Sequence, residues 1–412
     1  MTEAPLTFGQ LSVWRDVADL PSSRAHEANV AAVWPVPAGV TDGTILQALG
    51  ELAGRHESLR VRYDMATTGR LTQRLPAAPG PVPVRVADPG ATTEQVRNLE
   101  LERPFDLSHE PAWRAVIVRR DDLAEIVVVE HHITCDGWSN AILTRELTAL
   151  VAGSGLPLAP SLIELAWRQQ ADRDGLQAGA MAYFEEVLAA DRAAGHVAFQ
   201  ASATVQAGLV SGKVREAATA LAAEAGVPVG AVLLACAIRA VAGQLDRDVL
   251  AVDLMTSNRL TVSVRGLVTS MNQWVPALAG NAVEVPLAEL ATAMHRATLE
   301  AYKHGCYDVD SLRQLRRRLH GPAALRGSAM AFNFVPAGAA APGWLGKAQE
   351  DEVIVPERPF ATLFAQPCYV KVSDLGTALY LRVTSRLAGG AGAAEMILSD
   401  MRSSLISGDW TH

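Results

Sequence analysis

The spacing of apolar residues changes from a continuous run to helical periodicity between residues 126 and 150. Ile126-Val127-Val128-Val129 is a β-branched run of the kind that forms a strand buried on both faces. The apolar residues that follow recur every three or four positions, at Ile142, Leu143, Leu147 and Leu150. This region is therefore predicted to form a strand, a tight loop and a helix.

Similar patterns predict that strands and helices alternate along the chain. We expect strands over 28–36, 61–63, 115–119, 125–130, 250–255, 330–334 and 378–384. We expect helices over 39–54, 181–194, 215–225, 229–245, 288–299 and 395–405. The Gly- and Pro-rich residues 150–160 are typical of a linker, and 412 residues exceed the length of one ordinary domain. The expected fold is α/β (α+β), with domains at residues 1–170 and 171–412.

Composition narrows the class of protein. The formal net charge of -8 argues against binding to nucleic acid, which requires a basic surface. The four cysteines are far apart and form no CxxC pair, so neither a disulfide framework nor a zinc ribbon is indicated. The first residues lack the pattern of a signal peptide, and the longest apolar window, residues 227–243, contains an arginine. We expect a soluble cytoplasmic protein that does not enter a membrane.

The side chains best suited to catalysis lie in the predicted loop, in the stretch EHHITCDGWS at residues 130–139. Successive strand side chains point to opposite faces, so His131 and His132 are expected to divide into one supporting and one working histidine. A neutral imidazole accepts a proton from an amine or hydroxyl near neutral pH. Asp136 is either a second catalytic group or a buried anion paired with an arginine, and we favour the second. Gly137 would permit a backbone angle that a side chain forbids.

Three other interpretations compete with a catalytic role. Both rings could be ordinary core or surface histidines, they could bind a metal ion, or the loop could be structural without catalysis. Adjacent strand histidines diverge, no cysteine pair stands nearby and the HExxH pattern is missing, so no metal is expected.

The pattern HHxxxDG, residues 131–137, resembles the signature of the condensation-domain superfamily of nonribosomal peptide synthetases, which share the chloramphenicol-acetyltransferase-like fold. The longer stretch HHITCDGWSNAILTREL is similar to the form found in condensation domains that join two L-configured units. RHESLR, residues 55–60, matches the second segment of the family at every fixed position. In that resemblance one of its arginines, Arg60 or Arg55, pairs with Asp136.

Other segments resemble the family less closely. Residues 6–14, LTFGQLSVW, are similar to its first segment, and PFDL at residues 104–107 is similar to the stretch that leads into the central strands. Residues 265–276 occupy the place of the fifth segment, and Asn333 lies in the strand that follows the seventh. The fourth, sixth and seventh segments depart from the family pattern, so the resemblance is more specific in the first half of the chain.

The resemblance implies two chloramphenicol-acetyltransferase-like lobes in a V, with the active site in a tunnel at their interface. Its catalytic motif would be His132 with His131, Asp136 and Gly137, and His132 would act as a general base or as a positioning group. Backbone amides near Gly137, with Ser270 or Asn272 across the cleft, would support an oxyanion. The remaining residues expected to contact substrates are Trp138, Ser139 and Asn333.

The implied reaction is acyl transfer in natural-product or antibiotic biosynthesis. An acyl or aminoacyl group held as a phosphopantetheine thioester on a peptidyl or acyl carrier protein would pass to an amine, or to a hydroxyl, to give an amide or ester. No cofactor would be bound, and aligning the two reactants would supply much of the rate. We expect a free-standing, monomeric enzyme or an excised domain, with carrier proteins and small acyl and amine substrates as partners.

Three alternatives remain open at this point: a coenzyme A-dependent O-acyltransferase, an epimerisation-type domain and a catalytically inactive recruitment domain. The intact histidine pair argues against the last. The identities of the donor and the acceptor do not follow from one sequence.

Overall fold

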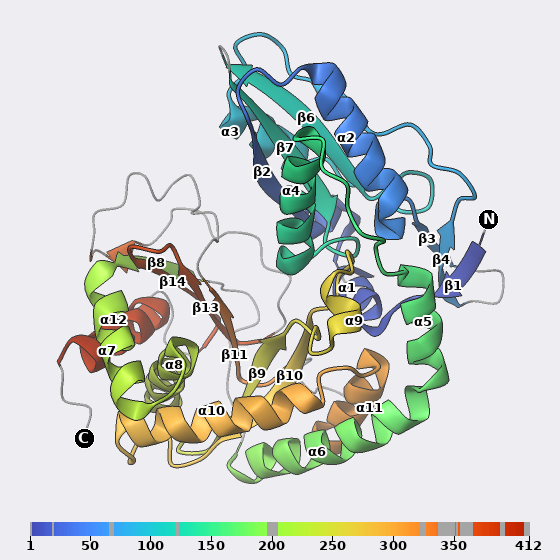
Figure 1. The fold of residues 1–412 in the computed structure, drawn as a ribbon. Helices are drawn as coiled ribbons and strands as arrows, with labels where there is room; N and C mark the ends of the chain where they lie inside the picture. The colour runs from blue at the N-terminus through green and yellow to red at the C-terminus, as the bar shows by residue number, and fades with distance from the viewer. Residues whose placement is uncertain are drawn as a thin grey trace. The chain divides into compact units, whose positions relative to one another are not determined.

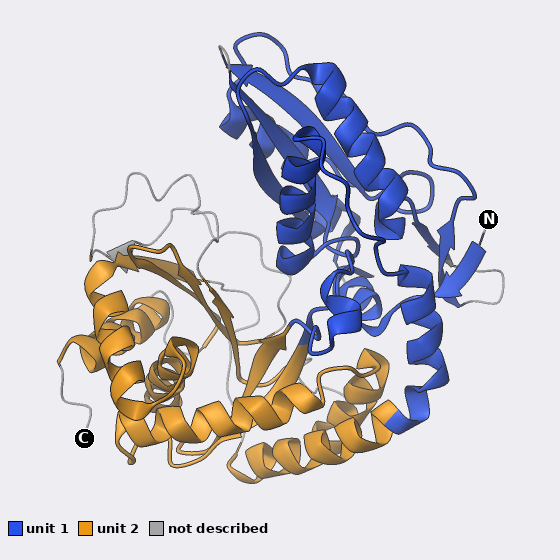
Figure 2. Ribbon diagram, viewed as in Figure 1, with its two compact units in different colours: residues 1–175, 257–273 blue, residues 176–256, 274–412 orange. Residues whose placement is uncertain are grey.

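The chain forms two compact units in the computed structural model (Figures 1 and 2). Unit 1 consists of Met1–Gly175 with Ser257–Gln273, and unit 2 of Leu176–Thr256 with Trp274–His412. These units differ from the predicted division at residue 170, because residues 257–273 fold with the first unit. The structure describes residues 2–18, 20–65, 70–120, 123–195, 205–321, 327–336, 351, 353–354, 366–387 and 392–407.

Unit 1 combines two small sheets with helices. Its elements are β1 (Thr2–Pro5), α1 (Phe8–Ala18), η1 (Ser22–Ala28), β2 (Asn29–Val36), α2 (Asp42–Arg55), η2 (Glu57–Leu59), β3 (Arg62–Met65), β4 (Leu71–Leu75), β5 (Val84–Val86), α3 (Thr93–Leu101), β6 (Trp113–Arg120), β7 (Leu123–His131), α4 (Gly137–Val151), α5 (Leu162–Ala171) and α9 (Val262–Arg265). The strand orders are β2-β7-β6-β5 and β1-β4-β3. β7 pairs antiparallel with β2 and β6, whereas β5 pairs parallel with β6.

Strand β7 is buried on both faces, which explains its continuous apolar sequence. Its even-numbered apolar residues pack with residues of α2 and α4, and its odd-numbered apolar residues pack with α3. Because side chains alternate, Glu130 continues the first face and His131 the second. The strand ends at His131, so His132 is the first residue of the loop that leads to α4. The predicted order of strand, loop and helix is confirmed.

Unit 2 is built around one large mixed sheet. Its elements are α6 (Arg173–Ala193), which begins in the last residues of unit 1, β8 (Val205–Ser211), α7 (Gly212–Ala225), α8 (Val229–Leu245), β9 (Leu250–Thr256), β10 (Gln273–Ala279), α10 (Leu287–Lys303), α11 (Val309–His320), β11 (Met330–Val335), β12 (Val353–Ile354), β13 (Cys368–Asp374), β14 (Leu379–Ser385) and α12 (Gly392–Ile406). The strand order is β10-β9-β11-β13-β14-β8-β12. β11 lies parallel to β9 and β13, and β14 lies antiparallel to β13 and β8. The mixed α/β class predicted from the sequence is confirmed.

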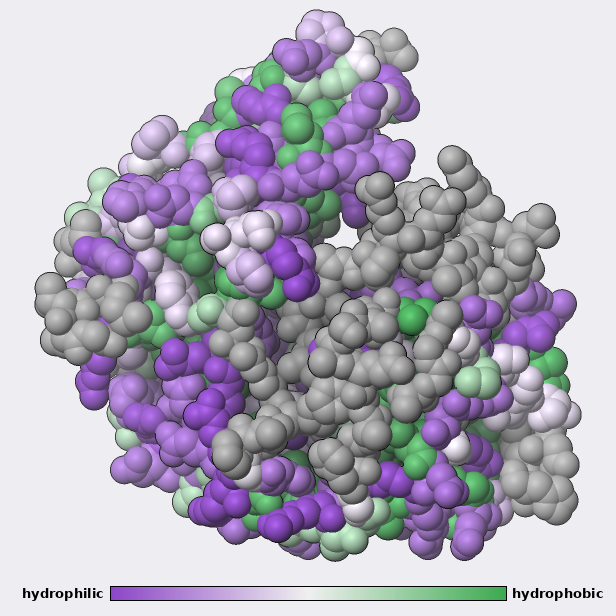
Figure 3. Space-filling model, turned by 180° about the vertical axis from the view of Figure 1, so that it is seen from behind, coloured by the Kyte–Doolittle hydropathy of each residue, from purple (hydrophilic) through white to green (hydrophobic). Residues whose placement is uncertain are grey.

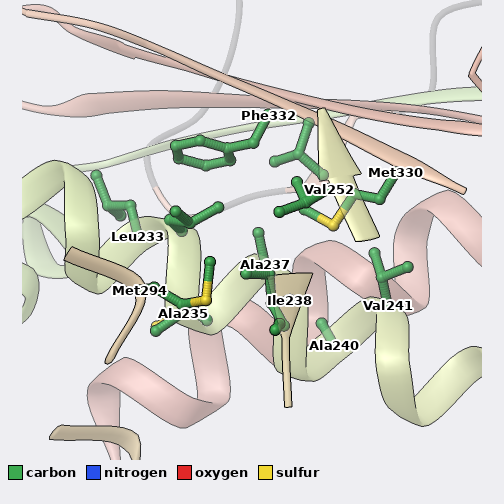
Figure 4. Close-up of a cluster of buried hydrophobic side chains, with 14 of the residues drawn as sticks. Leu233, Ala235, Ala237, Ile238, Ala240, Val241, Val252, Met294, Met330 and Phe332 are labelled. Atoms are coloured by element: carbon green, nitrogen blue, oxygen red, sulfur yellow. The ribbon is translucent and has the colours of Figure 1, made fainter. Parts of the chain in front are cut away.

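Helix α8 is the centre of the core of unit 2. Figure 4 shows Leu233 and Val241 of α8 in the same cluster as Val252 of β9 and Met330 and Phe332 of β11. Each large apolar side chain buried in this way contributes roughly 1.5–3 kcal/mol to stability. The helix therefore holds one face of the sheet in a fixed position.

The apolar character of α8 also bears on the question of membrane insertion. Among the described residues, no single helix has the length and apolar content of a membrane span, and α7 and α8 meet these criteria only as a pair bent by 107°. The face in Figure 3 is mainly hydrophilic where it is described, with apolar residues in separate spots. The core of unit 2 accounts for the apolar residues of α8.

Candidate active site

His131 is fully enclosed at the end of β7. It is 2% exposed, and its Nδ1 accepts a hydrogen bond from the backbone N–H of Ile133 at 3.1 Å. The ring of Phe105 packs edge-on against it, with centroids 6.5 Å apart. Burial lowers the pKa of His131 to about 3, so the ring stays neutral near neutral pH. His131 therefore holds the start of the loop in shape.

His132 has a different environment, because the strand has ended before it. Its side chain is half-buried, and its backbone N–H donates to the carbonyl oxygen of Ala28 at 2.8 Å. Its Nδ1 lies 3.0 Å from the carbonyl oxygen of Cys135. A carbonyl oxygen can only accept a hydrogen bond, so in the neutral ring Nδ1 carries the proton and Nε2 presents a lone pair. In this tautomer His132 can accept a proton at Nε2.

Asp136 is a buried anion held by four donors. Its carboxylate receives Nη1 and Nη2 of Arg259 at 2.7 and 3.0 Å, together with the backbone N–H groups of Ser139 at 2.8 Å and Met271 at 3.0 Å. The side chains of Asp136 and Arg259 are 0% and 1% exposed. The bond to Ser139 caps α4 at its N-terminus. Because all four of these bonds are internal to the unit, Asp136 holds the shape of the loop.

The expected partner of Asp136 was wrong, although its pairing with an arginine is confirmed. Arg55 donates to Glu146 of α4 at 2.8 Å, and His56 lies 2.8 Å from the same carboxylate oxygen. Arg60 forms no ion pair with Asp136, whose guanidinium partner is Arg259. The RHESLR segment instead joins the end of α2 to the second half of α4. The distance along the chain explains the error, since Arg259 lies 123 residues after Asp136.

Ser139 takes part in the same buried network. It is 0% exposed, and its hydroxyl donates to the carbonyl oxygen of Thr269 at 2.9 Å while accepting from Arg259 at 2.9 Å. This internal role takes the place of the predicted contact with a substrate. Trp138 is 46% exposed, and its indole N–H donates to the carbonyl oxygen of Arg265 at 2.9 Å. Of the two residues, only Trp138 offers a surface to a ligand.

Ser270 and Asn272 lie in the segment that folds with unit 1, and so belong to the same unit as the histidine motif. We expected these two residues to face the histidine motif from across a cleft. Instead, the backbone N–H of Met271, which lies between them, donates directly to Asp136. Ser270 is 0% exposed, and Asn272 is half-buried. Asn333 lies in unit 2, on β11, where its Nδ2 is 3.4 Å from the hydroxyl of Tyr369.

The two glycines near this network, Gly137 and Gly9, differ in how much space a side chain would have. Gly137 does not have a positive φ, and a Cβ built on it would meet nothing within 4 Å, so the backbone angle expected for it was wrong. It is exposed at the first position of α4, which leaves the backbone open to an approaching molecule. Gly9 of α1 is the crowded position, because a Cβ there would lie 2.5 Å from the carbonyl oxygen of Ser270. Gly9 therefore lets α1 contact the segment that holds Asp136.

Glu130 was not among the expected site residues. It is 1% exposed and accepts a hydrogen bond from Nδ2 of Asn140 at 3.2 Å. Burial raises the pKa of Glu130 to about 7. The sequence signal was present, since a carboxylate continued the apolar face of β7 at residue 130. Within the described part of the chain, no three His, Cys, Asp or Glu residues lie close enough together to hold a metal ion.

Comparison with known families gives a match over most of the chain. The family model described as "Condensation domain" matches residues 2–335. Phosphinothricin tripeptide synthetase PhsC of Streptomyces viridochromogenes is 33% identical over an alignment of 171 residues, and the match covers 38% of this chain and 15% of the relative. Malpinin synthetase of Mortierella alpina is 29% identical over an alignment of 189 residues, and the match covers 41% of this chain and 2% of the relative. The matches thus span only a small part of these curated relatives.

Solved structures agree with the fold over the full chain. A structure described as the molecular basis for condensation domain-mediated chain release from the enacyloxin polyketide synthase has a TM-score of 0.77 at 20% identity, covering 100% of this chain and 83% of that chain. The epimerization domain from the third module of tyrocidine synthetase B has a TM-score of 0.75 at 17% identity, covering 99% and 98%. At these identities the likeness establishes the fold alone.

Proposed function

The chain belongs to the condensation domain family, and from this premise we propose that it transfers an acyl or aminoacyl group from a carrier-protein thioester to an amine. The observation that carries the proposal is the tautomer of His132, whose Nδ1 is held by the carbonyl oxygen of Cys135 at 3.0 Å. The free Nε2 lone pair is the group that such a reaction needs. The product is an amide, or an ester where the acceptor is a hydroxyl.

His132 moves the proton in the proposed reaction. Nε2 takes a proton from the acceptor ammonium group, and the resulting amine attacks the thioester carbonyl carbon. The tetrahedral intermediate collapses with loss of the carrier thiolate, and the imidazolium returns its proton to that sulfur. The second proton that the former ammonium nitrogen must lose is released to solvent as the neutral amide forms. The C–N bond forms as the C–S bond breaks, and the histidine is regenerated. General acid–base catalysis of this kind contributes a factor of roughly 10²–10⁴.

The start of α4 supports the negative charge of the intermediate in this proposal. The first N–H groups of a helix have no partner within the helix and lie at its positive end. Asp136 takes the N–H of Ser139, so the donors meant here are those of Gly137 and Trp138. Gly137 is exposed at that position and has no side chain to keep a substrate away. Asp136 and Arg259 fix the loop between His132 and these N–H groups through their buried ion pair. Backbone donors in such a position are worth about 3–4 kcal/mol in related chemistry.

We propose peptidyl or acyl carrier proteins as the partners, with the substrate presented on their phosphopantetheine arm. Family membership supports this choice. No cofactor takes part in the proposed reaction, because a thioester is already activated for attack by an amine.

The decisive experiment follows the intact mass of an acyl-loaded carrier protein mixed with the purified chain and an amine acceptor. The expected result is loss of the acyl group, with formation of the amide, by the unchanged protein. His132→Ala should lower the rate by at least about 100-fold. The matched control is His109→Ala, since His109 is an exposed histidine of the same unit with a side chain 82% exposed.

The same assay separates the alternative reactions. An epimerisation-type activity run in D₂O would add one deuteron to the acyl group without releasing it. A coenzyme A-dependent acyltransferase would use an acyl-coenzyme A donor and leave the carrier unchanged. If His132→Ala retains the full rate of acyl loss, the proposed role of His132 is wrong. If no donor loses its acyl group to any acceptor, the proposed reaction is wrong.

A further inference from the structure

The large sheet of unit 2 has one apolar face and one polar face. On the apolar face, Val370 of β13 and Val383 of β14 are paired across the strands and belong to the core with α8 and α12. Side chains one position further along point the other way. On that opposite face the pairing aligns Asn333 with Lys371, and Lys371 with Arg382. The next position in the row after Arg382 is Gly208 of β8, which has no side chain.

The residues around this row are polar although they are largely buried. Tyr369 is 3% exposed and receives hydrogen bonds from Asn333 and Arg382. Ser373 and Thr384, on the same face, are 7% and 6% exposed. A polar face of this kind costs free energy unless its groups are satisfied. Thr384 and Tyr369 are satisfied within the sheet, since Gln206 donates to Thr384 at 3.1 Å and Asn333 to Tyr369 at 3.4 Å, which leaves the two cations of the row to be accounted for.

Lys371 and Arg382 form an uncompensated pair of positive charges. They lie directly opposite each other on neighbouring strands, where side chains stand about 5 Å apart and like charges repel. Within the described part of the chain, neither forms an ion pair with a carboxylate. Nearby acids of the same sheet are engaged elsewhere, since Asp374 pairs with Arg215 and Asp253 pairs with an arginine of α11.

Two further observations show that these cations are not ordinary surface charges. Both side chains are partly shielded from solvent, and Nε of Arg382 is buried without a hydrogen-bond partner among the described residues. Burial, and then the charge of Arg382, lower the pKa of Lys371 to about 8. The chain has only four lysines among 36 basic residues, so a lysine at this position stands out.

We propose that Lys371 and Arg382, with Asn333 beside them, form a binding site for an oxyanion, a carboxylate or a phosphate, on the polar face of the unit 2 sheet. An arginine provides paired N–H donors that match either group, and a lysine adds a point charge. The side chain of Asn333 provides an amide next to the two cations. An anion placed here would relieve the repulsion between them and satisfy the buried Nε of Arg382.

The source of the anion rests on the proposed function. A free acid acting as acceptor would present its carboxylate, whereas a carrier-bound acceptor has that group masked as a thioester. A carrier arm would instead present the phosphate of phosphopantetheine. The oxyanion chemistry is common to both sources, and the binding itself does not require that acyl transfer occurs.

The test is nuclear magnetic resonance of the full chain after reductive methylation of its lysines with ¹³C-formaldehyde. Four lysines give few resonances, and each titrates separately. Adding inorganic phosphate should raise the pKa of Lys371 by at least about one unit, because an opposite charge favours the protonated form. The resonances of Lys213 and Lys303, which are 69% and 66% exposed, should not change. Their constancy excludes a general effect of salt.

Matched ligand pairs identify the source. A response to phosphopantetheine but not to pantetheine assigns the carrier arm, and a response to glycine but not to glycinamide assigns the acceptor carboxylate. Arg382→Gln should weaken the response at least about tenfold, whereas Arg318→Gln, at an arginine 64% exposed on α11, should leave it intact. If neither phosphate nor any of the four ligands moves the Lys371 resonance, or if all lysines respond alike, the proposal is overturned. The readout needs no turnover, so failure of acyl transfer would not affect it.

Discussion

The buried ion pair between Asp136 and Arg259 gives the sharpest test of how the loop is held. Replacing Arg259 with methionine keeps most of the side-chain volume and removes the charge. Asp136 would then remain enclosed, with only the N–H groups of Ser139 and Met271 as donors. Removing one partner of a buried pair costs about 3–5 kcal/mol, because the other charge stays buried without compensation. We expect a loss of that size in the free energy of unfolding.

A double-mutant cycle isolates the pair itself. Asp136→Asn keeps an oxygen that can cap α4 but leaves Arg259 facing a neutral amide. The double variant removes both charges, so its cost should be smaller than the sum of the single costs by about 2–3 kcal/mol. The matched control is the pair of Arg318 and Glu185, whose side chains are 64% and 52% exposed. Its coupling energy should be below about 1 kcal/mol.

Urea unfolding followed by tryptophan fluorescence measures these energies. Five of the eight tryptophans lie in the residues of unit 1, so its transition is visible directly. The midpoint should shift while the dependence on urea stays constant. A cost below about 1 kcal/mol for Arg259→Met, or a coupling no larger than that of the exposed pair, would show that this ion pair does not hold the loop in shape.

Three further predictions follow from the geometry of the same unit. Gly9→Ala should lower the free energy of unfolding by at least about 2 kcal/mol, because its Cβ would lie 2.5 Å from the backbone of residue 270. Gly137→Ala, with open space around it, should lower it by less than about 1 kcal/mol. Equal losses for the two variants in thermal or urea unfolding would contradict this. Glu130 has a folded-state pKa of about 7, above its ordinary value near 4.5, so its contribution to stability is complete below pH 4.5 and is lost as the pH rises through 7. Glu130→Gln should therefore gain stability relative to the unchanged protein at pH 8 but not at pH 4.5, and a difference that does not vary with pH would count against it. His131 has its pKa lowered to about 3, so its contribution to stability is present above pH 6.5 and is lost as the pH falls toward 3. His131→Asn should therefore make the free energy of unfolding depend less on pH in that range. An unchanged pH dependence would show that His131 is not buried in the neutral form.

Local features of the site were predictable because they depend on residues close together in the chain. The apolar run before residue 130 and the helical spacing after it determine that a loop lies between β7 and α4. Alternation along a strand separates His131 from Glu130, and the end of the strand at His131 leaves His132 in the loop. An aspartate followed by glycine at the start of a helix is a cap signal that needs no tertiary contact.

Contacts between distant segments were not predictable in the same way. Arg55 and Arg259 are the same residue type, and neither periodicity nor spacing says which of them faces Asp136. The segment at residues 257–273 contacts α1 and the N-terminus of α4, although its sequence neighbours belong to unit 2. The expectation for Gly137 failed for a related reason, since a glycine can be retained for open space as well as for its backbone angles.

Short-range patterns in the amino-acid sequence predict the secondary structure around the histidine motif, the mixed α/β class and the likeness to condensation domains. Long-range packing is what brings Arg259 to Asp136 and sets Lys371 beside Arg382 on one sheet face. Both outcomes depend on how the backbone pairs and packs over long separations. The free energy of a charge depends on the atoms that surround it in the folded protein, and short-range patterns along the chain do not reveal which distant residues supply those atoms.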